Sequence, residues 1–329
     1  MNTNPTDPAP RDSAARADAR ARDFEQQHSR HLRALAYRML GSRADAQDIV
    51  QDAWLRWSEV DPSTVDNDRA FLSRTVTNLC LDRIGSAQSR KEHYVGMWLP
   101  EPLVDDAQDW SPDPQDTTEF AQDVSVAFML TLERLGPVER AAFLLHDVFG
   151  LGYEEVARHL QRSEQACRQL VSRARSRVKG EYARCQVEDE ERQRLLYAFA
   201  QALVAGDVEK LAGVLAHDAI LITDGGGLAT AIPQAMHGGD RIAKALVGFN
   251  KSVDTATLRY RTAVVNGLPG YVLYTAEGAP LQAVALSPAG DDAPGRLQAV
   301  YIIRNPHKLQ HLVASAGQSV PVSARSGSL

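Results

Sequence analysis

The sequence has few cysteines. Cys80, Cys167 and Cys185 are the only three among 329 residues, and no two of them form a Cys-x-x-Cys pair. Isolated thiols provide neither a disulfide framework nor a zinc-binding pattern, so they favour a reduced, cytoplasmic protein. The sequence also lacks an apolar run long enough to span a bilayer, and its first 23 residues lack the apolar segment of a signal peptide. We therefore expect a protein without membrane contact.

The sequence also lacks an excess of positive charge. Its formal net charge is −6, so binding to nucleic acid through overall charge is excluded, and any DNA contact has to come from a local basic patch. Hydrophobic residues make up 44% and charged residues 24% of the chain, which is typical of globular proteins with packed cores. The length suffices for two or three domains.

The segment Tyr153–Lys179 has the pattern of two short helices joined by a turn at residues 161–163. At 100° per residue, the second helix gathers apolar residues on one side and cationic and amide residues on the other. Such a helix suits a DNA major groove, where its first residues would contact base edges. An ordinary solvated helix face would show the same pattern, so the segment alone leaves both interpretations open. The apolar side comprises Cys167, Leu170, Val171, Ala174 and Val178.

Composition divides the chain into six parts. The first and last are polar and low in apolar residues, and we expect them to be a disordered and a flexible tail. The second and fourth show helical periodicity, and an acidic, proline-rich linker separates them. The fifth has helices before a run of strands, which predicts an α+β domain with a curved antiparallel sheet. The expected fold is multidomain, with two all-α domains, the second a helix-turn-helix, before the α+β domain. The parts are residues 1–23, 24–92, 93–123, 124–184, 187–313 and 314–329.

Three helical stretches together resemble an extracytoplasmic-function sigma factor of RNA polymerase. ALAYRMLGSRADAQDIVQDAWLRW is similar to the polymerase-binding helices of sigma domain 2, and RAFLSRTVTNLCLDRIGSAQSRKE is similar to its promoter −10 segment. LGPVERAAFLLHDVFGLGYEEVARHLQRSEQACRQLVSRARSRV is similar to sigma domain 4. The resemblance implies a protein that directs core RNA polymerase to promoters and initiates transcription, with core polymerase and promoter DNA as partners.

The resemblance also implies roles for individual residues. An acidic helix side would bind a basic arm of the polymerase, although a plain solvated face is the alternative. A turn at residues 61–68 and the helix after it would hold an unstacked −10 base and its strand, unless Arg83 forms an ion pair with Asp82 instead. The polymerase set is Asp45, Asp48, Gln51 and Asp52. The −10 set is Asn67, Arg69, Arg74, Asn78 and Arg83. For the −35 element, the base set is Gln165, Arg168, Gln169 and Ser172, and the phosphate set is Arg162, Arg173 and Arg175.

Three further motifs resemble the SigJ-like subgroup, which carries a C-terminal SnoaL-like domain with a cone-shaped fold. They are WLPEPL, DGGG and NPHKL. Two positions depart from the subgroup: Leu228 replaces a common Lys, and His307 replaces a usual Asp. We expect the motifs to form a regulatory contact between domains. Its members are Trp98, Leu99, Pro100, Glu101, Pro102, Asp224, Gly225, Gly226, Gly227, Asn305, Pro306, Lys308 and Leu309.

The cone-shaped fold also occurs in enzymes, so acids and histidines of this domain are candidates for catalytic groups. DGGG suits a tight turn better than a catalytic site, and we expect no catalysis, cofactor or metal. A small ligand in the C-terminal domain is left open, and no anti-sigma partner is expected to be required. Two alternatives remain: a ligand-sensing helix-turn-helix regulator that acts without polymerase, and an enzyme fused to a DNA-binding region. The catalytic candidates are His217, Asp218, Asp224 and His237.

Overall fold

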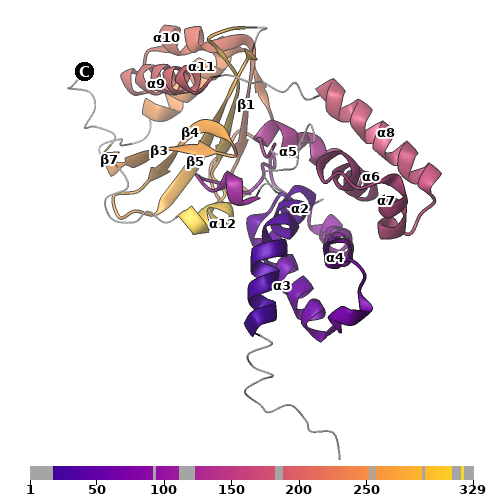
Figure 1. Cartoon of the computed structure of the whole chain (residues 1–329). Helices are drawn as coiled ribbons and strands as arrows, with labels where there is room; N and C mark the ends of the chain where they lie inside the picture. The colour runs from indigo at the N-terminus through magenta and orange to yellow at the C-terminus, as the bar shows by residue number, and fades with distance from the viewer. Residues whose placement is uncertain are drawn as a thin grey trace, which may run out of the picture.

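The structure is a computed structural model, and it describes residues 18–91, 94–110, 123–181, 188–251, 254, 257–290, 293–312 and 320–321. Figure 1 shows two groups of helices on one side of a sheet and a third group of helices on its other side. None of the helices in the described part of the chain combines the length and apolar content that a bilayer crossing requires.

The first helical group begins earlier than the sequence predicts. Residues 18–24 are helical, whereas the expected tail reached residue 23, because Arg20 and Phe24 make contacts with the following helices. Residues 1–17 lie outside the described part. Gly41 ends α2 at a φ of 65°, and Ser42 then caps α3 by accepting from the Asp45 N–H at 3.1 Å. The elements are η1 (Glu25–Ser29), α2 (Arg30–Leu40), α3 (Arg43–Glu59), η2 (Pro62–Thr64) and α4 (Asp68–Lys91).

The second helical group contains the helix-turn-helix. The turn after α7 places Gln161 at a φ of 52°, and Ser163 caps α8 through the Ala166 N–H at 3.2 Å. The predicted apolar side of α8 is buried at Cys167, Val171 and Ala174. The elements are η3 (Ala107–Trp110), α5 (Val126–Glu133), α6 (Pro137–Phe143), η4 (Leu144–Val148), α7 (Tyr153–Leu160) and α8 (Glu164–Glu181).

The two helical groups share one hydrophobic core. Phe149 packs edge-on against His31 with 4.8 Å between ring centroids, and Arg140 donates to the Met39 carbonyl at 2.6 Å. His159 of α7 lies 3.0 Å from the Ala70 carbonyl at the start of α4. The helix-turn-helix is therefore held against the helix that is expected to contact the −10 element.

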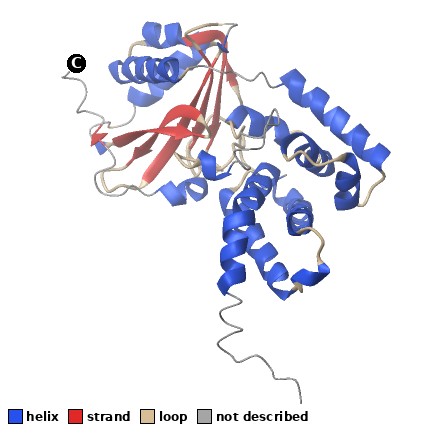
Figure 2. Ribbon diagram, in the orientation of Figure 1, coloured by secondary structure: helices blue, strands red, loops and turns tan. Residues whose placement is uncertain are grey.

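The C-terminal domain is α+β, as predicted, but its sheet is mixed. Figure 2 shows its strands in red beside the helices. The strand order is β2-β1-β6-β5-β4-β3-β7, and β1 runs parallel to β6 while the other pairs of described strands are antiparallel. The predicted antiparallel pairing holds for every described strand pair except β1 with β6. That pair is parallel because α11 carries the chain across the sheet after β1, so β1 does not pair with its successor among the long strands. The elements are α9 (Asp189–Ala205), α10 (Val208–Val214), β1 (Leu215–Asp224), β2 (Met236–His237), α11 (Gly239–Lys251), β3 (Arg259–Val265), β4 (Leu268–Tyr274), β5 (Pro280–Pro288), β6 (Leu297–Ile303), α12 (Pro306–Leu309), η7 (Gln310–Leu312) and β7 (Val320–Pro321).

The sheet buries both of its faces. Val284 and Val300 point to the side covered by α9, α10 and α11, whereas Ala285 and Tyr301 point to the opposite side, because successive strand residues alternate between faces. Leu99 of the linker packs on that opposite side. The linker therefore lies between the sheet and the helical groups, and it positions the site described next.

Candidate nucleic-acid and partner interfaces

The polar face of α8 is exposed where base contacts are predicted. Gln165, Gln169 and Ser172 are exposed, and so is Arg168. Arg168 forms an ion pair with Glu164, and its guanidinium group lies 4.3 Å from the centre of the Tyr153 ring. This stacking holds the Arg168 side chain near the first turn of the helix, the part that enters the groove in helix-turn-helix proteins.

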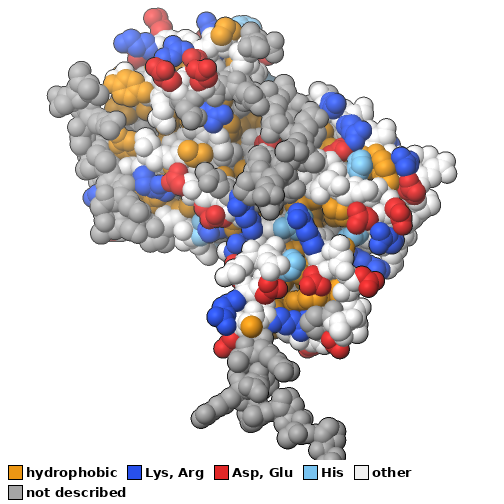
Figure 3. Space-filling model, in the orientation of Figure 1, with side chains coloured by type: hydrophobic (Ala, Val, Ile, Leu, Met, Phe, Trp, Pro, Cys, Tyr) orange, Lys and Arg blue, Asp and Glu red, His pale blue; other side chains and the backbone are white. Residues whose placement is uncertain are grey.

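The predicted phosphate contacts differ from one another in their surroundings. Arg162 is exposed at the turn, but Arg173 lies 3.7 Å from Glu139 and Arg175 binds Asp147 through two nitrogens. Both acids are nearly buried. Acidic and basic side chains consequently alternate over α7 and α8 in Figure 3, and part of the positive charge of α8 is balanced within the domain.

The expected −10 residues lie on the loop before α4 and along that helix. Asn67 caps α4 by accepting from the Ala70 N–H at 2.9 Å, and Arg69 lies 3.0 Å from Nδ1 of His31. Arg74 is exposed, and Asn78 is half-buried. The −10 candidates, from Asn67 to Arg83, are thus spread over more than four turns of one helix rather than gathered in one cleft.

Arg83 and Asp45, which were expected on two different surfaces, meet each other. Arg83 Nη1 donates to Asp45 Oδ1 at 2.6 Å. Arg83 therefore forms an ion pair, as the alternative interpretation allowed, but with Asp45 of α3 and not with its neighbour Asp82. The bond joins the α3 and α4 helices.

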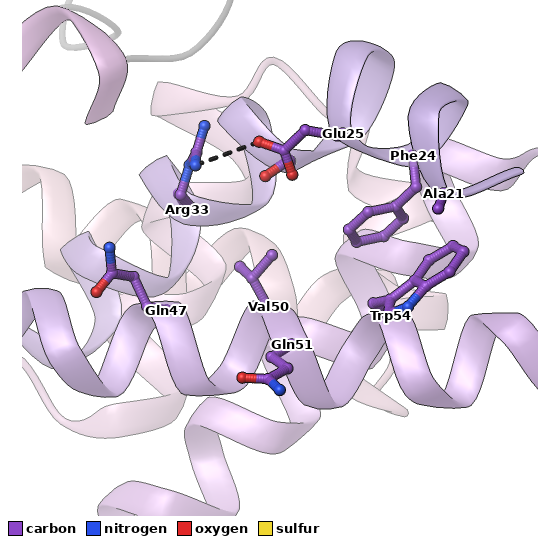
Figure 4. A pocket seen from close by; sticks show the side chains of 9 residues that line it. Ala21, Phe24, Glu25, Arg33, Gln47, Val50, Gln51 and Trp54 are labelled. Carbon is purple, nitrogen blue, oxygen red and sulfur yellow. Dashed lines mark ion pairs between the residues drawn. The ribbon is translucent and has the colours of Figure 1, made fainter. Parts of the chain in front are cut away.

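The remaining polymerase candidates share one exposed side of α3. Asp48, Gln51 and Asp52 are exposed, and the side chain of Leu55 next to them is 54% exposed. A cavity of about 340 Å³ opens beside Gln51, between α3 and the N-terminal helical segment. Phe24 and Trp54 line one end of it, with 5.1 Å between their ring centroids (Figure 4). The surface thus combines acidic, amide and apolar groups.

The motifs of the linker and the C-terminal domain meet at Asp224, whose side chain is fully buried. Its Oδ2 accepts from Lys308 Nζ at 2.8 Å and from the Leu99 N–H at 2.9 Å, and its Oδ1 accepts from the Tyr94 hydroxyl at 2.6 Å and the Gly226 N–H at 3.0 Å. Burial, and then the hydrogen bond to Asp224, raises the pKa of Tyr94 above its usual range, which keeps this hydroxyl protonated as a donor. All the hydrogen-bonding positions of the carboxylate are therefore filled by protein groups.

The glycines of this cluster allow close approach. A Cβ at Gly226, whose φ is 58°, would lie 2.2 Å from Nδ2 of Asn305, and a Cβ at Gly41 would lie 2.4 Å from the Trp98 ring. Trp98 in turn covers Lys308, with 4.7 Å between Nζ and the ring centre. The linker tryptophan therefore contacts both the end of α2 and the C-terminal domain. Gly225 and Gly227 lie in the same turn.

The NPHKL segment forms α12. Asn305 caps it by accepting from the His307 N–H at 3.0 Å, and its amide donates to Tyr94 at 2.9 Å. Pro306 and His307 are exposed and Leu309 is buried. The two departures from the subgroup, His307 and Leu228, thus both lie at exposed positions away from the Asp224 carboxylate.

Glu101 joins the linker to the first helical group. Its Oε2 accepts from the backbone N–H groups of Arg43 at 2.8 Å and Ala44 at 3.2 Å, at the N-terminus of α3. A carboxylate in this position satisfies open N–H groups and is favoured by the helix dipole. His311 lies 3.4 Å from Glu101, and burial followed by the charge of Arg43 lowers its pKa. Pro100 and Pro102 on either side are buried.

Asn266 was missed by the sequence reasoning, although it contacts the first helical group, the start of the second and the linker between them. Its Nδ2 donates to the Tyr37 hydroxyl at 2.7 Å and to the Val124 carbonyl at 3.0 Å, and its Oδ1 accepts from the Leu103 N–H at 3.1 Å. It is fully buried at a φ of 50°. The available signal was the Asn-Gly pair of the β3–β4 hairpin, which marks a tight turn but not the partners of the side chain.

The catalytic candidates do not converge. His217, Asp218 and His237 are exposed, whereas Asp224 is buried on the linker side. Among the described residues, no group of His, Cys, Asp and Glu is arranged to hold a metal ion. The geometry gives these four residues no shared site.

Comparison with known proteins gives the family. The Sigma-70 region 2 model matches residues 25–90, and the Sigma-70 region 4 model matches residues 125–178. The ECF RNA polymerase sigma factor SigJ of Mycobacterium tuberculosis is 35% identical over 288 residues, which cover 84% of this chain and 89% of SigJ. The crystal structure of SigJ superposes with a TM-score of 0.64 at 33% identity, covering 85% of this chain and 95% of that one. The probable sigma factor SigI of the same species is 35% identical over 190 residues, 57% of this chain and 64% of SigI.

Proposed function

The chain belongs to the extracytoplasmic-function RNA polymerase sigma factors, and we propose that its C-terminal domain holds the two sigma domains in a closed arrangement that polymerase and promoter DNA open. Sigma factors bind core RNA polymerase and promoter DNA, and this chain carries both sigma domains. The proposal concerns how the relative position of the two sigma domains is controlled.

The contact between the sigma domains supports a closed arrangement. His159 of the helix-turn-helix lies 3.0 Å from the carbonyl of Ala70 at the start of α4. The −35 and −10 elements are centred about 25 base pairs apart, which corresponds to roughly 85 Å of DNA at 3.4 Å per base pair. Two domains that share a core cannot reach both elements, so the contact has to break before the promoter is bound.

The observation that carries the proposal is the position of Asn266. One amide bonds a helix of sigma domain 2 through Tyr37, the first residues of sigma domain 4 through Val124, and the linker through Leu103. Glu101 adds a second connection, because the carboxylate that caps α3 belongs to the linker held by the C-terminal domain. Separation of the sigma domains thus requires the C-terminal domain to release at least one of them.

Once the domains separate, the exposed residues have the chemistry that their roles need. The acidic side of α3 suits a basic arm of the polymerase, with Asp48 and Asp52 as the charged members. Arg168 and Gln169 offer donors for base edges, and Arg162 offers a phosphate contact. Arg173 and Arg175 already form ion pairs with acidic side chains. A phosphate contact from either arginine would therefore have to be made in addition to its ion pair.

The C-terminal domain provides the restraint without a second protein, so the proposal includes no anti-sigma partner. It also includes no catalysis, because the polar groups around Asp224 are satisfied by the chain itself. A ligand that weakened the Asn266 or Asp224 contacts would shift the chain toward the open arrangement. The size of the shift would equal the difference between its affinities for the open and the closed arrangement.

Transcription by reconstituted polymerase tests the proposal together with a distance measurement. Donor and acceptor dyes are attached at Glu59→Cys and Arg158→Cys, both exposed positions, in a chain that also carries Cys185→Ser. Cys80 and Cys167 are buried and can remain. We expect promoter-dependent transcription with core polymerase and a loss of energy transfer on binding of polymerase and promoter. Transcription with unchanged energy transfer contradicts the closed arrangement. Promoter binding without transcription supports the helix-turn-helix regulator instead.

A further inference from the structure

Arg20 lies in a short helical segment that precedes the region matched by the sigma family model, which begins at residue 25. Its guanidinium group lies at the C-terminal end of α3. It donates to the carbonyl oxygens of Trp57, of Val60 at 2.8 Å and of Ser58 at 3.3 Å. These carbonyls belong to the last turn of α3 and the residue after it, where the helix leaves C=O groups without an internal partner.

The same side chain also fixes an aromatic ring. The Arg20 guanidinium carbon lies 4.7 Å from the centre of the Trp57 ring, and that ring is 5.5 Å from the ring of Phe71 in α4. A planar guanidinium group can stack and donate several hydrogen bonds at once, which an ammonium group cannot. Arg20 is therefore coupled to the end of α3 directly and to the start of α4 through Trp57.

Between these two helix ends lies the loop of residues 61–67. Asp61 accepts from the Ser63 N–H at 3.0 Å and from the Ser63 hydroxyl at 2.9 Å, and Thr64 donates to the Asp61 carbonyl at 2.6 Å. Asn67 caps α4 at the far end. The loop is bonded within itself and anchored at both ends, yet Asp61, Ser63 and Asn67 are exposed. It presents a preformed polar surface to solvent.

We propose that Arg20 is a positioning residue for promoter opening, because it holds this loop in the shape that receives an unstacked base of the −10 strand. The inference rests on the proposed sigma function and extends it to a residue outside the matched region. A protein that holds a base outside the DNA stack needs the polar groups that contact this base to be in position before the base binds. Without Arg20, three carbonyls lose a charged donor, and the start of the loop is no longer fixed.

The test compares Arg20→Ala, Arg20→Lys and the control Arg22→Ala in polymerase holoenzyme. Arg22 is exposed and bonds only the carbonyl of Asp18 among the contacts described for its side chain. Binding is measured to single-stranded −10 oligonucleotides that are either intact or abasic at one position. We expect Arg20→Ala to weaken binding to the intact strand about tenfold, as the loss of charged hydrogen bonds predicts. Binding to the abasic strand should hardly change. Arg20→Lys should lie between, and Arg22→Ala should match the parent.

The outcomes separate the inference from the function on which it rests. If Arg20→Ala keeps the preference of the parent for the intact strand, Arg20 does not position the loop. If Arg20→Ala weakens binding to the intact strand, to the abasic strand and to core polymerase alike, Arg20 contributes general stability and the inference is also wrong. If the parent holoenzyme binds intact and abasic oligonucleotides equally well, whichever position is abasic, the proposed −10 function is contradicted, and the inference with it.

Discussion

The amide of Asn266 donates to the hydroxyl of Tyr37 at 2.7 Å, which joins the β3–β4 hairpin of the C-terminal domain to α2 of sigma domain 2. The two residues are 229 positions apart in the sequence, and both are fully buried. Because the same amide also bonds the linker and the start of sigma domain 4, it is the residue whose removal should separate the domains with the least other damage.

Asn266→Gly should open the closed arrangement. Glycine tolerates the φ of 50° at this position, so the loss is confined to the amide. The Leu103 N–H loses its acceptor, which should lower the free energy of unfolding by about 1–3 kcal/mol. Small-angle scattering should report a larger radius of gyration. The control is Asn250→Ala, which removes an amide that, among the residues the structure describes, bonds Leu203 of the same domain, and it should leave the radius unchanged. Equal radii for both variants contradict the prediction.

Asp224 and Lys308 should be strongly coupled. Removing one partner leaves the other charge buried without its counter-ion, so Asp224→Asn alone should lower the free energy of unfolding by about 3–5 kcal/mol. With Lys308→Met added, the loss should be smaller than the sum of the two single losses by about 1–3 kcal/mol. Urea unfolding of the four proteins measures this. The exposed pair Glu154 and Arg158 is the control and should show almost no coupling. Additive losses at Asp224 and Lys308 contradict the idea.

The sequence predicts best what depends on local periodicity. The apolar side of α8, the turn at Gln161 and the cap at Ser163 follow from side-chain spacing and local conformational preference, and the structure has all three. The same rules predict α+β order in the C-terminal domain. They miss the parallel pairing of β1 with β6. The pairing of strands far apart in sequence depends on the path that the chain takes across the sheet between them.

The partners of polar side chains are harder to predict, since they depend on contacts between distant segments. The resemblance assigned Asp45 to the polymerase residues and Arg83 to the −10 residues, but it could not show that α3 and α4 bring the two side chains within 2.6 Å of each other. Asn266 and Arg20 carry contacts to segments that no local pattern identifies. The WLPEPL, DGGG and NPHKL motifs were recognised by resemblance, and their meeting at Asp224 depends on the complete fold.

Arg168 and Arg175 of α8 should affect different properties. Arg168→Ala should lose about 1–3 kcal/mol of discrimination at one −35 base pair if the side chain contacts a base edge, with stability unchanged. Arg175→Ala leaves the nearly buried Asp147 without its bidentate partner, so it should lower stability and reduce transcription from all promoters alike. Transcription from single-base promoter variants and urea unfolding measure the two effects. A promoter-specific effect of Arg175→Ala with parental stability would reverse the assignment.

Charge reversal on α3 should abolish binding to core polymerase. Asp48→Arg with Asp52→Arg places two cations on an exposed helix side that is expected to face a basic arm, which should weaken association by about 3 kcal/mol or more. The control, Glu209→Arg with Asp240→Arg, makes the same change in net charge at exposed positions of the C-terminal domain. Core affinity and thermal unfolding are measured for both. Retained core binding in the α3 variant removes the proposed interface.

His31 should make the contact between the sigma domains sensitive to acid. Burial, and then the charge of Arg69, lowers its pKa from 6.5 to about 3, and its two nitrogens contact Arg69 and Ser73. Between these two pH values the unfolded chain binds a proton at His31 that the folded chain does not, so stability falls as the pH decreases below about 6.5.

Replacing the ring isolates this effect. His31→Gln keeps a donor and an acceptor but cannot be protonated in this range. Between pH 6.5 and pH 4.5, the parent should lose about 2 kcal/mol more of its free energy of unfolding than His31→Gln does. Above about pH 7.5 the two stability curves should run parallel, because His31 is then neutral in both states. Urea unfolding at several pH values measures the difference. Parallel curves down to pH 4.5 would show that His31 accepts its proton in the folded chain as readily as in the unfolded one, and that acid opens the sigma domains, if at all, through other groups.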